Sequence, residues 1–307
     1  MKKIHIIILS ILVVLLGAGI TLFYISDISK SNQIYEDSAR DYTALSESDE
    51  SYEGYDDSFD EESEMITSSV TSENTDETDT DTEADIDDAQ ESDAADEQTY
   101  SFRYEGPWTN QINVDIRSIM SKYPDVKGWL FFENEDISYP IVQGLSDDTY
   151  LRTSYDGQKT VAGSIFLESE NAYDFSDPHT IIYGHNMRNN TMFGHLDNYM
   201  KHSGYYDYHK YFQIITTDTS GNAVKYRYKI FSYGKTTASS KVYTVCRSND
   251  EVFGDVIQYI QSGALKLTDV PVYQTDQVIT LSTCSGKNNR VYVSAVKTDS
   301  YSEVSGN

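Results

Sequence analysis

An acidic stretch over residues 27–99 constrains this chain most, because it holds 27 Asp and Glu residues against Lys30 and Arg40. It carries −25 of the total net charge of −27. Few aliphatic groups and dense like charge cannot offset the entropy lost on folding, so we expect a disordered linker. Its spacing lacks the D-x-D-x-D-G pattern of an EF-hand loop. This favours a solvated spacer over a calcium-loaded or partner-binding tail.

An uncharged run of 20 residues, 6–25, precedes the acidic stretch. As a helix it is long enough to cross about 30 Å of hydrocarbon. Lys2 and Lys3 lie before it and acidic residues after it, which predicts a cytoplasmic N-terminus and an extracellular remainder. The alternative is a cleaved signal peptide, but its apolar core is usually about 7–15 residues long. We therefore expect residues 1–26 to form an uncleaved, single-pass membrane anchor.

Residues 100–307 are rich in aromatic and β-branched side chains, and their 23 acidic and 19 basic residues nearly balance. They contain no basic stripe to neutralise phosphates, which disfavours nucleic-acid binding. Eight short strand-like runs with only two or three helices indicate a mainly β domain, a closed or nearly closed barrel with helical insertions. The runs are Gly128–Phe132, Ile137–Gln143, Ser164–Leu167, Thr180–Tyr183, Tyr211–Thr217, Ala223–Tyr233, Val278–Thr283 and Arg290–Thr298.

Two helices are predicted beside these strands. A short N-terminal helix is capped by Asn113 and stopped by Pro124. A longer helix over 249–262 begins with a capping box of Ser248 and Glu251. It lies between the sixth and seventh strand-like runs.

The best candidates for chemistry lie at the ends of strand-like runs. Cys284 ends one run, and Arg290 opens the next after a short loop, which predicts a thiol nucleophile beside a fixed cationic donor. His185 ends another run, after Gly184, and is the candidate base. No metal-binding constellation or phosphate-binding glycine loop occurs in the sequence, so neither a metal nor a cofactor is expected.

Each candidate also has a structural alternative. For Cys284 the alternatives are a buried small hydrophobe and a disulfide with Cys246, since the domain is expected outside the cytoplasm. For His185 it is a structural histidine. Chain order excludes a papain-like site, in which Cys precedes His, and S-T-C-S-G does not match the caspase pattern Q-A-C-x-G.

The segment Thr280-Leu281-Ser282-Thr283-Cys284 resembles the TLxTC signature of sortases, the membrane-anchored transpeptidases of Gram-positive cell surfaces. Five further blocks resemble class B sortases in the same order, and the resemblance extends over about residues 110–299. They are Gly128-Trp129-Leu130, Tyr139-Pro140-Ile141-Val142-Gln143-Gly144, Gly163-Ser164-Ile165-Phe166-Leu167, Thr180-Ile181-Ile182-Tyr183-Gly184-His185-Asn186-Met187 and Met192-Phe193.

The resemblance implies an eight-stranded sortase-type β-barrel, with the helix between the sixth and seventh strands as a class B trait. It also implies a catalytic site in which Cys284 is the nucleophile, His185 the acid and base, and Arg290 the donor to the carbonyl oxygen. Asn171 falls where class B sortases often have an Asn near the site, with an ordinary loop residue as the alternative. The candidate substrate-binding residues are Asn171, Ser282 and Thr283.

By the same resemblance, the domain over 100–307 is an extracellular cysteine transpeptidase. It cleaves a sorting signal on secreted proteins through a thioester acyl-enzyme and transfers the acyl group to an amine of the cell wall. Alternatives are a pilin-polymerising sortase that uses a lysine amine, a hydrolytic cysteine peptidase and a non-catalytic surface adhesin. The expected partners are sorting-signal proteins, the acceptor amine and the membrane.

Overall fold

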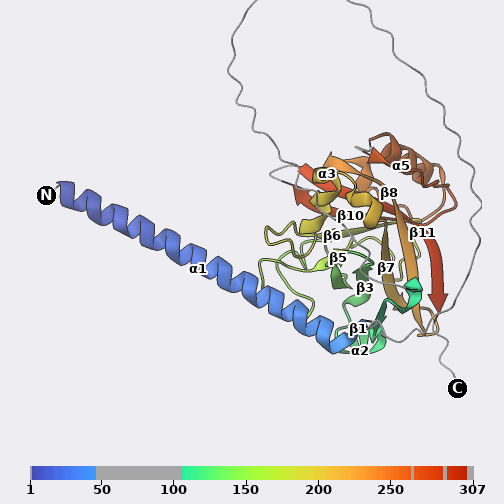
Figure 1. Ribbon diagram of the computed structural model, residues 1–307, viewed down its shortest axis with the longest axis horizontal. Helices are drawn as coiled ribbons and strands as arrows, with labels where there is room; N and C mark the ends of the chain where they lie inside the picture. The colour runs from blue at the N-terminus through green and yellow to red at the C-terminus, as the bar shows by residue number, and fades with distance from the viewer. Residues whose placement is uncertain (1, 46–105, 264–265, 286–288, 303–307) are drawn as a thin grey trace, which may run out of the picture. The chain divides into compact units, whose positions relative to one another are not determined.

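The computed structural model describes residues 2–45, 106–263, 266–285 and 289–302, and only the backbone at residues 2–12, 14, 15, 45, 284 and 285. Within this part of the chain, eight strands form a closed barrel in the order β3-β4-β5-β6-β10-β11-β8-β7, and β7 pairs again with β3 (Figure 1). The predicted eight-stranded barrel is therefore confirmed. The strands are β3 (Val126–Phe132), β4 (Ser138–Val142), β5 (Ile165–Leu167), β6 (His179–Gly184), β7 (Tyr211–Thr217), β8 (Ala223–Thr237), β10 (Val278–Ser285) and β11 (Asn289–Ser302). The two-residue β9 (Lys266–Leu267) pairs with β8 outside the ring.

Alternation along the strands gives the barrel two apolar layers. In β11, Val291 and Val293 are buried in the barrel interior, whereas Tyr292 and Val296 pack in a second cluster on the outside. Helix α5 (Glu251–Ser262) covers that outer cluster with Phe253, Val256, Ile257 and Ile260. Burial on both faces explains why these strands read as nearly continuous apolar runs.

The two predicted helices are present, but with different caps. Helix α2 (Ile116–Lys122) is capped by Asp115, which accepts a hydrogen bond from the Ser118 amide, while Asn113 lies in β2 (Ile112–Val114). Helix α5 lies between β8 and β10, the sixth and seventh barrel strands, as predicted. Its cap is Asp250. Each Asp accepts a hydrogen bond from an amide in the first turn of its helix, and its negative charge suits the positive end of the helix. Shorter helices are η1 (Trp108–Asn110), η2 (Gly194–Asp197), α3 (Asn198–Lys201), α4 (Tyr205–Tyr208) and η3 (Lys241–Tyr243).

The first part of the predicted linker is ordered. Helix α1 runs from Lys2 to Tyr42, and β1 (Thr43–Leu45) follows it. Ile34 and Tyr35 of α1 are buried in the core cluster of the barrel. The prediction of disorder is therefore wrong for residues 27–45, because the acidic composition of the whole stretch hid a short apolar face at its start. Residues 46–99 lie outside the described residues, and their disorder stays a prediction.

The pairing of β1 with β2 also changes the interpretation of the acidic stretch. Leu45 lies opposite Ile112 in an antiparallel register, so the chain leaves this domain at β1 and returns to it at β2. A segment with both ends at one place cannot set the distance between that domain and residue 25. The β1–β2 register therefore argues against the spacer interpretation, which a deletion of the segment tests.

No helix in the part of the chain that the structure describes is both long and apolar enough to cross a membrane. The predicted anchor over 1–26 lies partly outside the residues whose side chains are described.

Candidate active site

Three neighbouring strands bring the sequence candidates to one end of the barrel. Strands β6 and β10 are parallel, and Thr283 pairs with Gly184, the residue before His185. Strands β10 and β11 are antiparallel, and Cys284 pairs with Arg290. Parallel neighbours end at the same edge of a sheet, so the histidine and the cysteine follow paired positions. The side chain of Cys284 lies outside the described residues.

A pocket of about 160 Å³ opens at this end of the barrel. Two structural elements form its walls: the strand ends just described, and the loop over 143–164 that joins β4 to β5. Four of the six predicted site residues line the pocket, which brings them together as expected. The lining residues are Asp147, Leu151, Phe166, Tyr183, Gly184, His185, Ser282, Thr283 and Arg290.

Close packing explains the glycine before His185. A Cβ at Gly184 would lie 2.5 Å from Ile165 Cδ1 and 2.7 Å from the Phe193 ring, which is closer than real Cβ contacts occur. The backbone at the end of β6 therefore fits directly under these side chains, and a larger residue here would force Ile165 and Phe193 to shift.

His185 is held by a backbone carbonyl. Its Nε2 lies 2.7 Å from the carbonyl oxygen of Leu151. A carbonyl only accepts hydrogen bonds, so Nε2 carries the proton and Nδ1 is the nitrogen that remains for chemistry. Burial lowers the pKa of His185, the hydrogen bond to Leu151 raises it, Arg152 lowers it, and the net direction is downward.

Thr283 and Arg290 both retain capacity to bind a polar group. The Thr283 hydroxyl is buried and has no hydrogen-bond partner among the described residues. Leaving such a hydroxyl unpaired is unfavourable, so a substrate polar group that reached it would relieve that cost. The Arg290 guanidinium donates to the backbone oxygen of its neighbour Asn289 at 3.2 Å, and no ion pair with a described carboxylate occupies it.

Comparison with known proteins agrees with this geometry. Residues 132–298 match the sortase domain family. The chain is 31% identical over 176 residues to sortase B of Listeria monocytogenes, which covers 57% of this chain and 68% of that protein. The chain belongs to the sortase family. Sortase B of Clostridium perfringens has a TM-score of 0.53 and 29% identity over 60% of this chain and 99% of that structure. A Staphylococcus aureus sortase B–substrate complex has a TM-score of 0.54 and 28% identity, and the match covers 60% of this chain and 84% of that structure.

These relatives establish a class B sortase, as the sequence blocks predict. The enzyme is therefore a cysteine transpeptidase associated with the cell surface. It acts on proteins that carry sorting signals and transfers them to acceptors in the cell wall. The adhesin alternative has no remaining support.

Asn171 does not line the pocket of this sortase. Its amide nitrogen donates to Asp177 at 2.7 Å and to the carbonyl of His179 at 2.8 Å, and its oxygen accepts from the Ile181 amide at 2.9 Å. The side chain is buried and fastens the start of β6 to the preceding loop. These contacts favour the structural alternative. Ser282 lines the pocket, but its hydroxyl is paired with Tyr243 at 2.8 Å.

Cys246 is a free, buried thiol at the other end of β6. The backbone of Cys246 forms a β-bridge with His179, and His179 pairs with Val278 at the start of β10. Cys284 lies six residues further along β10. At about 3.3 Å per residue this separation is on the order of 20 Å. Bonded cysteines have Cα atoms within about 7 Å, so the disulfide alternative is wrong. Burial raises the pKa of the Cys246 thiol to about 11, which makes it unreactive.

The 143–164 loop contributes groups that the sequence analysis missed. Asp147 lines the pocket and accepts from the Ser169 amide at 2.8 Å. Glu168 lies beside it and accepts from the Tyr183 hydroxyl at 2.8 Å. Burial first, and Asp147 second, raise the pKa of Glu168. Asp147 and Glu168 are far apart in the sequence and belong to no recognisable motif. Only the folded structure shows that they lie together.

Proposed function

We propose that Cys284 is the nucleophile of this class B sortase, with His185 as acid and base and Arg290 as oxyanion donor. The observation that carries the proposal is the shared pocket, which His185, Thr283 and Arg290 line and which adjoins the backbone of Cys284. The Cys284 thiolate attacks the carbonyl carbon of a peptide bond in the sorting signal, and the bond to the leaving amine breaks to give a thioester.

Nδ1 of His185 handles the protons of both half-reactions. As imidazolium, it gives a proton to the departing amine while Nε2 keeps its hydrogen bond to Leu151. The neutral ring then takes a proton from the incoming amine as this amine attacks the thioester. A lowered pKa suits this exchange, because both charge states must be accessible during one turnover.

Arg290 and Thr283 act on the carbonyl oxygen rather than on protons in transfer. The guanidinium keeps its charge at any working pH, so it stabilises the negative charge that develops on that oxygen. The unpaired hydroxyl of Thr283 supplies a second donor from the adjacent strand.

The acceptor in this proposal is an amine of peptidoglycan, and a pilin lysine is the competing acceptor. The test is mass spectrometry of products from a sorting-peptide library mixed with cell-wall amines or with a lysine peptide. We expect an amide product with the wall amine. A free acid whose yield does not fall when amine is added would indicate a hydrolase instead. His185→Ala abolishes product, whereas His202→Ala, which changes an exposed histidine, leaves it unchanged.

Residues 6–25 anchor the enzyme in the membrane in this proposal, with a cytoplasmic N-terminus and an extracellular catalytic domain over 100–307. The support is the uncharged 20-residue run behind Lys2 and Lys3 and the continuity of α1 from Lys2 to Tyr42. The mature protein then begins near Met1 and stays with membranes after high-salt washing. A soluble form that starts beyond residue 25 would contradict the proposal.

A further inference from the structure

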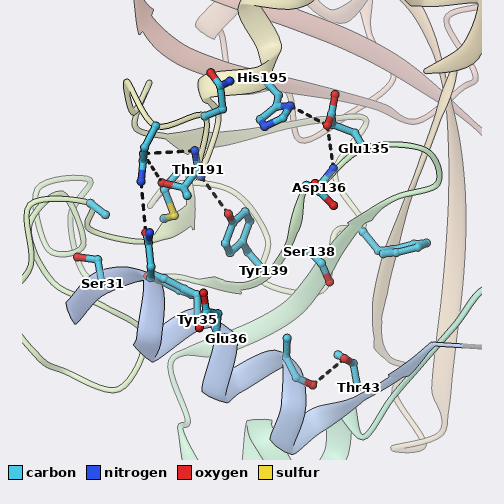
Figure 2. A pocket seen from close by; sticks show the side chains of 17 residues that line it. Ser31, Tyr35, Glu36, Thr43, Glu135, Asp136, Ser138, Tyr139, Thr191 and His195 are labelled. Carbon is cyan, nitrogen blue, oxygen red and sulfur yellow. Dashed lines mark hydrogen bonds and ion pairs between the residues drawn. The ribbon is translucent and has the colours of Figure 1, made fainter. Parts of the chain in front are cut away.

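Helix α1 is fastened to the 143–164 loop by side chains from two of its turns. Asp27 accepts from the Val161 amide at 2.6 Å, and the Tyr35 hydroxyl donates to the carbonyl of Gly163 at 2.5 Å. The Tyr35 ring packs edge-on against Tyr139, with ring centroids 5.3 Å apart. Figure 2 shows Tyr35 on α1 at the edge of a cavity of about 510 Å³ between this helix and the barrel, with Tyr139 across from it. Neither His185 nor Arg290 lines that cavity.

Gly163 transmits this attachment to the site. It has a left-handed φ of 57°, and a Cβ at this position would lie 2.5 Å from the carbonyl oxygen of Leu151. The backbone at Gly163 therefore rests directly against that carbonyl. The amide of the next residue, Ser164, donates to the carbonyl of Tyr150 at 3.0 Å. This hydrogen bond holds the two ends of the segment 150–164 together.

The same Leu151 carbonyl accepts the Nε2 proton of His185. A continuous set of contacts thus leads from the α1 hydroxyl through Gly163 and Leu151 to the imidazole. We propose that Tyr35 is a positioning residue for His185, acting through the Gly163 backbone and the Leu151 carbonyl. The inference rests on the catalytic role of His185 given above, and it makes α1 a working part of the catalytic domain.

The position of the Leu151 carbonyl decides two properties of His185. It keeps the proton on Nε2, which leaves Nδ1 as the nitrogen available for proton transfer, and it raises the pKa of the ring against the effect of burial. The other charged groups near the ring are Arg152, which lowers its pKa, and Asp147 and Arg290, which line the same pocket. None of these contacts Tyr35, so a change at Tyr35 reaches His185 only through the loop backbone.

The test is Tyr35→Phe in the full chain, which removes one hydroxyl and keeps the ring packing. We expect kcat to fall about tenfold while KM stays within about twofold, because a displaced acid–base group slows chemistry without removing a substrate contact. The NMR titration of the His185 ring, assigned by its loss in His185→Gln, moves to lower pH. These two readouts follow the imidazole and not the overall fold.

Tyr206→Phe is the matched control. Tyr206 is as buried as Tyr35, and its hydroxyl also donates to one backbone carbonyl, that of Ile230, at 3.0 Å. We expect both variants to lower the melting temperature, and only Tyr35→Phe to change kcat and the His185 titration. If Tyr35→Phe matches Tyr206→Phe in both readouts, Tyr35 is merely structural and the inference is overturned. The catalytic role of His185 is tested separately: it is overturned if His185→Ala keeps wild-type turnover. A failure of the positioning role of Tyr35 can therefore be told from a failure of the proposed function.

Discussion

The two walls of the pocket differ in how their residues are specified. The strand wall, formed by His185, Thr283 and Arg290, presents side chains from the ends of three paired strands. The loop wall, formed by Asp147 and Leu151 of the 143–164 loop, presents one carboxylate and one backbone carbonyl. In the proposed mechanism the strand wall performs the chemistry, whereas the loop wall orients it. Substitutions in the strand wall should therefore remove a catalytic group outright, whereas changes that reach the loop wall should act less strongly, through the tautomer and pKa of His185 and through stability.

The largest effect is expected in the strand wall at Cys284. Cys284→Ala removes the nucleophile, so no acyl-enzyme forms and transpeptidation is lost. Intact-protein mass spectrometry after mixing with a sorting peptide measures the adduct. Cys246→Ala is the control, because this buried thiol lies at the far end of β6 and should leave the adduct unchanged. An adduct that persists in Cys284→Ala would overturn the nucleophile assignment.

A smaller loss is expected for Arg290→Lys. Lysine keeps the charge but loses the planar set of donors, so turnover should fall about 10²–10³-fold with little change in peptide affinity. Turnover, affinity and melting temperature are measured on the same variant. Near-normal turnover with a lower melting temperature would show that Arg290 only supports the strand wall.

The difference between the walls also explains what could be predicted from sequence. The barrel, the α5 insertion and the strand wall followed from β-periodicity and from short blocks that contain His185 and Cys284, since both signals are local. The Leu151 carbonyl left no such signal, because any residue supplies a carbonyl and the fold alone decides where it points. Asn171 shows the converse error: a residue type typical of a site is used here to fasten a strand.

The docking of α1 was missed for a related reason. Over residues 27–99 as a whole, acidic residues outnumber the few apolar residues at the start, so the average composition hides them. Ile34 and Tyr35 are neighbours with buried side chains. They form too short an apolar stretch to show the repeating pattern of a buried helix face. The contact partners of that face lie more than a hundred residues away, in the loop wall and its surroundings.

In the loop wall, Asp147→Asn tests orientation and charge without touching the nucleophile. The raised pKa of Glu168 means that the folded protein binds this proton more tightly than the unfolded chain. Stability therefore falls as pH rises from the unfolded Glu pKa of about 4.3 through the folded value. Asparagine keeps the acceptor for Ser169 but removes the neighbouring charge, so stability should fall less as pH rises. The gain in the free energy of unfolding over wild type should therefore be larger at pH 7 than at pH 4.

Urea unfolding at the two pH values measures this difference, and Asp148→Asn is the control because its side chain is exposed next door. Equal shifts for both variants, or a gain at pH 4 alone, would show that Asp147 does not raise the pKa of Glu168.

The smallest effect is expected from removing residues 46–105, which lie between the halves of the β1–β2 pair. Leu45 already lies opposite Ile112. A flexible link of about eight Gly and Ser residues between Leu45 and Gly106 should therefore close the chain without moving α1. Since α1 holds the loop wall through Tyr35 and Asp27, the deletion should leave the melting temperature and peptide turnover unchanged. Transfer to cell-wall acceptors by the membrane-bound deletion variant should also be unchanged, because a segment with both ends at one place does not set how far the enzyme reaches. If transfer to the wall falls while turnover of soluble peptides stays normal, the acidic segment has a role in reaching the acceptor that the β1–β2 topology does not predict.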